Sequence, residues 1–193
     1  MRCLPVASTI FRQGARHPAL RRHQPCAILA LKHADRLDLV PGFSQWLERA
    51  GRELIASSDM IVPMPLHRFR LWRRRYNQAG ELARALSRRS GVPVDTGALI
   101  RSRPTPSQGT MPSAKARRRN VLGAFQVPDR EKVAGRHVLL VDDVLTTGAT
   151  AEAASRALRR AGAAGVQILA LARVVRAAEI PILDSRQNRG SGL

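Results

Sequence analysis

One run of thirteen residues, Val138–Thr150, carries the groups best suited to chemistry in this chain. It opens with four apolar residues, continues through the adjacent acids Asp142 and Asp143, and ends in a small, hydroxyl-rich loop before a helical stretch at 151–161. A tight turn between a strand and a helix binds anions, because backbone N–H groups, hydroxyls and the helix dipole converge there. The two acids repel phosphate and instead suit the vicinal hydroxyls of a ribose, with Mg²⁺ nearby. The run therefore predicts a ribose 5-phosphate site.

The loop is the part of this run that would hold the 5-phosphate. Gly148 has no Cβ, so the backbone can approach the anion closely. The run matches neither a Walker A loop nor a dinucleotide-binding fingerprint. The alternative is an ordinary buried strand that ends in two aspartates before a helix. The residues assigned to the 5-phosphate are Leu145, Thr146, Thr147, Gly148, Ala149 and Thr150.

A second candidate anion site follows the apolar residues Met60–Val62. Prolines cannot donate to a strand ladder, so Pro63 and Pro65 turn the strand into a loop. Five arginines follow between Arg68 and Arg75, and guanidinium groups bind phosphate oxygens in pairs. The segment is a candidate pyrophosphate cradle, and the alternative is a solvated basic start of a helix. The residues assigned to the cradle are Met64, Pro65, Leu66, His67, Arg68, Arg74 and Arg75.

Apolar periodicity predicts the elements that position these loops. Trp46 lies on the apolar stripe of the first expected helix and is assigned to the core, and Gly91 suits the end of the second. A loop at 102–112, rich in Pro, Ser, Thr and Gly, is typical of a segment that closes over a site and excludes water. The expected helices are 41–57, 79–86 and 151–161, and the expected strands are 60–62, 98–101, 138–141 and 166–171.

Composition indicates one folded α/β domain with an excess of positive charge. The 193 residues are enough for a core, and the formal net charge is +19. Arginines make up 30 of the 33 basic residues, which favours phosphorylated substrates or nucleic acid as partners, unless a coding bias has enriched arginine on a solvated surface. Cys3 and Cys26 form neither a disulfide framework nor a zinc motif, so a cytoplasmic location is expected. No apolar run is long enough for a bilayer, and no membrane partner is expected.

The two ends of the chain carry little pattern. Residues 1–25 are basic, with no acid before Asp35, and are expected to be disordered or atypical. Residues 26–175 form the expected domain, and 176–193 form a loose tail.

Val138–Thr150 resembles the PRPP-binding signature of the type I phosphoribosyltransferases. Further blocks, in the same order along 28–173, resemble the ComF family of competence-associated relatives of these enzymes. The resemblance implies the type I phosphoribosyltransferase fold, in which helices flank a mostly parallel sheet and a flexible hood loop covers the site. The blocks are 61–68, 74–78, Thr105, Gln108, 117–120 and 124–125.

The resemblance implies PRPP binding with Mg²⁺ held indirectly by Asp142 and Asp143, and phosphoribosyl transfer to an acceptor that the sequence does not identify. No catalytic residue is assigned, because Thr146 stands where purine enzymes of the class often carry an acid and cannot act as a base near neutral pH. The rival hypothesis is a non-catalytic module that binds single-stranded DNA or a competence protein, and a third is a PRPP-sensing regulator. Another ribose phosphate and a homodimer are further expected partners. The hood residues are Arg101, Thr105, Gln108, Arg117 and Asn120.

The chain departs from the ComF pattern in two places. Members usually begin with a cysteine-rich zinc ribbon, and nothing here supplies four ligands, so no zinc is expected. Arg75 stands where the family typically has glycine, which removes backbone freedom from the candidate cradle.

Overall fold

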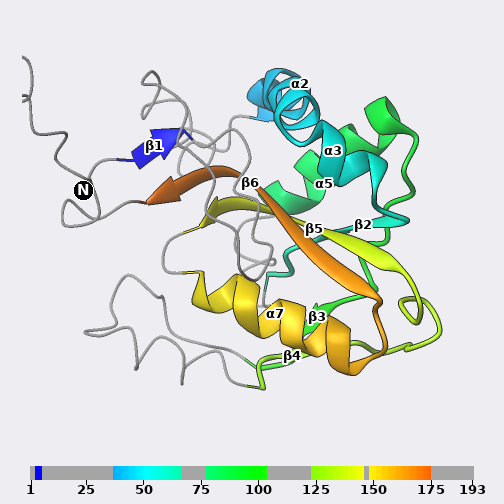
Figure 1. Ribbon diagram of the computed structural model, residues 1–193. Coiled ribbons are helices and arrows are strands. Elements are labelled where there is room, and N and C mark those ends of the chain that lie inside the picture. The colour runs from blue at the N-terminus through cyan, green and yellow to red at the C-terminus, as the bar shows by residue number, and fades with distance from the viewer. Residues whose placement is uncertain (1–2, 6–36, 67–76, 104–122, 146–147, 175–193) are drawn as a thin grey trace, which may run out of the picture.

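A computed structural model of the chain describes residues 3–5, 37–66, 77–103, 123–145 and 148–174. A four-stranded sheet with the order β1-β6-β5-β2 forms its centre (Figure 1). Strands β2 (Met60–Pro63), β5 (His137–Leu145) and β6 (Gly165–Val174) run parallel, and β1 (Cys3–Pro5) pairs antiparallel with the end of β6. The expected α/β class with a mostly parallel sheet is confirmed.

Helices cover both faces of the sheet (Figure 1). Helices α2 (Val40–Ala50), α3 (Arg52–Ala56) and α5 (Gln78–Ser90) lie on one face, and a 3₁₀ turn η1 (Leu37–Leu39) precedes them. Helix α7 (Ala149–Arg160) lies on the other, beside the short pair β3 (Ile100–Arg101) and β4 (Phe125–Gln126). Each face therefore has its own apolar core.

Strand β5 is buried on both faces and paired on both edges. Its residues alternate between the two cores: Val138 and Leu140 pack on the α7 side, and Leu139 packs on the α5 side. The strand was expected to end at 141, and that boundary is wrong, because β6 continues alongside and pairs Asp142 with Ala170. Both acids therefore lie within the strand and are held by its backbone.

Two further expectations needed correction. The expected helix at 41–57 divides at Gly51, where a Cβ would lie 2.8 Å from the Leu169 side chain of β6, so the close approach of the chain to the sheet favours glycine. Trp46 is not a core residue: it is 41% exposed and meets the Phe43 ring edge-on at 6.1 Å. Phe43 and Leu47 fill the core instead.

Other expected elements were found with shifted bounds. Helix α5 ends as expected at Gly91, which has a left-handed φ of 77°. The strand expected at 98–101 is limited to Ile100–Arg101, and β1 is an element for which the sequence showed no signal. The division of the chain at residues 25 and 175 stays a prediction, since 6–36 and 175–193 lie outside the described residues.

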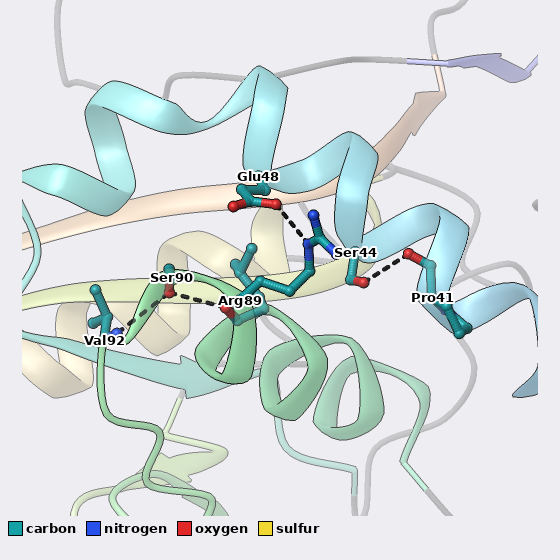
Figure 2. Close-up of polar contacts among 7 residues, drawn as sticks. Pro41, Ser44, Glu48, Arg89, Ser90 and Val92 are labelled. Carbon is teal, nitrogen blue, oxygen red and sulfur yellow. Dashed lines mark hydrogen bonds and ion pairs between the residues drawn. The ribbon is translucent and has the colours of Figure 1, made fainter.

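An ion pair joins α2 to α5 across the outer surface of this layer (Figure 2). Arg89 Nε lies 2.5 Å from Glu48 Oε2, and the two side chains are 41% and 33% exposed. Solvent screens such a pair, so we expect Arg89→Ala to lower the free energy of unfolding by less than ~1 kcal/mol. Urea unfolding of this variant and of the exposed neighbour variant Arg88→Ala measures the difference. A loss far above that limit would show that the pair, rather than apolar packing, joins the helices.

Candidate sugar-phosphate site

The candidate site lies at the carboxyl edge of the sheet, where β2 and β5 end side by side. Pro63 pairs with Val141, and the Met64 N–H then donates to the Val141 carbonyl at 2.7 Å. This register brings the start of the candidate cradle next to Asp142. The parallel arrangement thus joins two segments that lie about eighty residues apart in the sequence.

The two acids are fixed by hydrogen bonds to their own strand. Asp142 is buried, at 9% exposure, and its Oδ1 accepts from the Asp143 N–H at 2.9 Å. Asp143 is half-buried, and its Oδ1 accepts from the Val144 N–H at 2.7 Å. One oxygen of each carboxylate is therefore occupied locally. Carboxylate oxygens are the kind of acceptor that ribose hydroxyls require.

The phosphate-loop residues that the structure describes surround the start of α7. Leu145 ends β5 and is buried, while Gly148 stands at the N-cap with a left-handed φ of 75°. Ala149 begins the helix and Thr150 belongs to its first turn, so the helix begins two residues before the expected start at 151. The assignment of both residues to the 5-phosphate stays a prediction. Because the N-cap residue is glycine, it supplies no side-chain hydrogen bond to the first N–H groups of this twelve-residue helix. Thr146 and Thr147 lie outside the described residues.

The candidate cradle is described at its two ends. Met64 and Pro65 are buried and Leu66 is half-buried just beyond β2. The chain is described again from Asn77, whose Nδ2 donates to the Met64 carbonyl at 3.0 Å. The two ends of the connection therefore meet at the carboxyl edge of the sheet. His67, Arg68, Arg74 and Arg75 lie outside the described residues.

The hood is described only at its base, where β3 and β4 pair beside α7. Arg101 is half-buried, and its guanidinium carbon lies 5.4 Å from the centroid of the Phe125 ring, within cation–π range. The Ser102 N–H donates to the Ala124 carbonyl at 3.0 Å and keeps the two chains together. The hood residues Thr105, Gln108, Arg117 and Asn120 lie outside the described residues.

The acids fit a magnesium ion that is bound mainly through its substrate. In the ranges that the structure describes, no three His, Cys, Asp or Glu side chains gather as metal ligands. Mg²⁺ usually keeps several waters and binds through one or two carboxylates plus substrate phosphates. Asp142 and Asp143 match this donor set. Among the same described residues, no helix has the length and apolar character to cross a membrane.

Two polar residues at the start of α5 were missed as site residues by sequence reasoning. Asn77 makes the contact to Met64, and Gln78 is only 2% exposed. Gln78 Nε2 is buried and donates to no atom of the described residues. Gln78 lies four residues before Leu82, on the apolar stripe of the helix, and that spacing was the available signal.

Gln78 provides a test of this buried donor. A donor left unpaired inside a protein costs about 1–3 kcal/mol, so we expect Gln78→Met to raise the free energy of unfolding by an amount in this range. Urea unfolding measures the change, and Gln45→Met, at an exposed position of α2, is the matched control and should show almost none. A destabilised Gln78→Met variant would mean that the carboxamide makes a favourable contact in solution.

Comparison with known proteins identifies the family. The model of the phosphoribosyl transferase domain matches residues 77–183. DNA utilization protein YhgH of Escherichia coli O157:H7 is 42% identical over 117 residues, which are 61% of this chain and 50% of that protein. Competence protein F of Haemophilus influenzae is 41% identical over 116 residues, 60% of this chain and 50% of that protein. The expected resemblance to the ComF family is confirmed by these relatives.

A third relative comes from nucleotide metabolism. Adenine phosphoribosyltransferase of Streptomyces avermitilis is 39% identical over 85 residues, 41% of this chain and 47% of that protein. The chain spans about half the length of the curated relatives it matches. The family match extends over more than half of the chain and contains α5, both acids, Gly148 and α7. The chain therefore belongs to the phosphoribosyl transferase domain family.

Proposed function

We propose that this chain binds PRPP together with Mg²⁺ at the carboxyl edge of its sheet and transfers the phosphoribosyl group to an acceptor, in the service of DNA uptake in the cytoplasm. The observation that carries the proposal is the β5–Gly148–α7 unit, in which two strand-held acids precede a helix that begins at a left-handed glycine. The names of the YhgH and competence protein F relatives support the link to DNA uptake.

Different residues would bind the 5-phosphate, the ribose and the pyrophosphate of PRPP. The N-terminus of α7, with Gly148 and Thr150, would bind the 5-phosphate through N–H and hydroxyl groups. Asp142 and Asp143 would accept hydrogen bonds from the ribose hydroxyls, and Met64–Leu66 would face the pyrophosphate. Bound Mg²⁺ would neutralise charge on the pyrophosphate oxygens.

The reaction itself would be a displacement at C1 of the ribose. The bond from C1 to the pyrophosphate oxygen breaks, its electron pair leaves with pyrophosphate, and a lone pair of the acceptor forms the new bond to C1. Donors and cations that hold the leaving pyrophosphate stabilise the charge that develops on it, and so lower the barrier. Residues of the hood would exclude water from the oxocarbenium-like carbon.

Calorimetric titration of PRPP with and without Mg²⁺ tests the binding step. We expect saturable binding that requires Mg²⁺, together with competition by pyrophosphate and by ribose 5-phosphate, which each fill one half of the site. Release of pyrophosphate in the presence of candidate acceptors then tests transfer. A folded protein that gives no heat with PRPP and Mg²⁺ would refute the proposal.

The charge of the chain favours a second candidate, a module that binds single-stranded DNA or a competence partner without turnover. A formal charge of +19 supports contact with a phosphate backbone, and an aromatic content of 4% disfavours extended base stacking. Such binding would weaken steeply with salt. Titration of a labelled oligothymidine at low and high salt, with and without PRPP, separates the candidates: competition by PRPP would place both ligands at one site.

A further inference from the structure

The side chain of Asn77 does not cap its helix, although the residue occupies the N-cap position of α5. Asn77 is the N-cap residue of α5, with the extended backbone of a cap (φ −107°, ψ 109°). Asparagine is among the preferred N-caps because its side-chain oxygen accepts from the first-turn N–H groups. Here no side-chain cap forms at this end of α5, within the part of the chain that the structure describes, and the carboxamide turns to the Met64 carbonyl instead.

The chemistry of this contact is unambiguous. A carbonyl oxygen can only accept, so the atom of Asn77 that lies 3.0 Å from Met64 O must be the donor nitrogen. The first turn of α5 fits around the side chain: a Cβ at Gly80 would lie 3.4 Å from Asn77 Cβ and 3.6 Å from its Cγ. The Glu81 N–H donates to the Asn77 carbonyl at 3.0 Å and fixes the backbone of the same residue.

The contact continues a line of hydrogen bonds that begins at the acids. The Val141 carbonyl, directly before Asp142, accepts from the Met64 N–H at 2.7 Å. The Met64 carbonyl accepts in turn from Asn77 Nδ2. Both backbone groups of Met64 are thereby engaged, one by β5 and the other by the start of α5. The line fixes the N-terminus of α5 relative to Asp142.

We propose that Asn77 is a positioning residue that holds the two ends of the 65–76 connection against β5 and so presets the pyrophosphate side of the site. This inference rests on the proposed function, because it names what the contact serves. Asn77 touches no substrate in this role. By joining the two ends of the connection before the ligand binds, Asn77 lowers the conformational entropy that the protein would otherwise lose on binding.

The variant Asn77→Asp separates positioning from helix capping. Aspartate caps helices as well as asparagine does, so the unfolding midpoint and the hydrogen exchange of the Glu81 amide should match the wild type or improve. Aspartate cannot donate to the Met64 carbonyl, and its charge faces that oxygen. We expect the dissociation constant for PRPP with Mg²⁺ to rise about tenfold, which corresponds to ~1.4 kcal/mol.

A second variant, Asn77→Ser, and the wild type serve as controls for Asn77→Asp. Asn77→Ser is another good cap that lacks a carboxamide, and it should lose affinity like Asn77→Asp. If either variant keeps wild-type affinity while the wild type binds PRPP, the positioning role is refuted and the proposed function stands. If the folded wild type does not bind PRPP, both are refuted. Loss of Glu81 protection in parallel with affinity would show a capping role instead.

Discussion

Replacement of Asp142 by asparagine should weaken Mg²⁺-dependent PRPP binding about a hundredfold. The substitution keeps the size of the side chain and an oxygen that can accept from the Asp143 N–H, now 2.9 Å from Oδ1, so the strand should hold its shape. It removes the negative charge that strengthens hydrogen bonds from the ribose hydroxyls and attracts Mg²⁺. Hydrogen bonds to charged groups contribute about 1.5–3 kcal/mol, which corresponds to ten- to hundredfold in affinity, and loss of the ion adds to this. Calorimetry with PRPP and Mg²⁺ measures the effect.

Asp129 provides a matched control position for the Asp142→Asn substitution. Its Oδ1, like that of Asp142, accepts from a backbone N–H, here that of Glu131 at 3.0 Å. Asp129 lies in the exposed turn before β5, at the amino end of that strand. Asp129→Asn makes the same change of charge and should leave PRPP affinity unchanged. Both variants should bind oligothymidine alike, since that binding depends on total charge. If Asp142→Asn lost DNA and PRPP binding equally while staying folded, the two sites could not be separate.

The central strand β5 was predictable because its apolar sequence agrees with its buried position in the fold. Four apolar residues at 138–141 suit a strand buried on both faces, and they are fully buried between β2 and β6. Gly91 was placed correctly as the end of α5 because a left-handed cap favours glycine. These two cases depend on residue type alone.

The remaining features depend on contacts that the sequence does not display. Strand β5 extends through its acids because β6 happens to continue alongside, which no local pattern around Asp142 reveals. Trp46 has the spacing of the core stripe, but Phe43 and Leu47 already fill the space beneath α2. The Asn77 contact joins residues thirteen apart, and its donor role contradicts the usual role of asparagine at a cap. The arginines assigned to the cradle stay a prediction.

A side chain at Gly148 should cost PRPP affinity without blocking the loop physically. Gly148 has a φ of 75°, and apart from its chain neighbours no atom of the described residues lies within 4 Å of a Cβ placed there. The penalty for valine therefore comes from the backbone, at about 1–2 kcal/mol or more for the left-handed region. Valine either keeps this conformation under strain or moves the N–H groups at the start of α7 away from the 5-phosphate. We expect Gly148→Val to weaken PRPP binding about thirtyfold, a change of ~2 kcal/mol measurable by calorimetry.

Gly135→Val isolates the binding effect from the strain. Gly135 has nearly the same φ of 72° and the same open space around a Cβ, but it lies in the turn that leads into the amino end of β5. Both variants should therefore lose similar stability in urea unfolding, and only Gly148→Val should lose PRPP and ribose 5-phosphate affinity. Equal affinity in the two variants would mean that the helix N-terminus does not hold the phosphate. Because strain is matched, a difference between them can only come from the place of Gly148 at the start of α7.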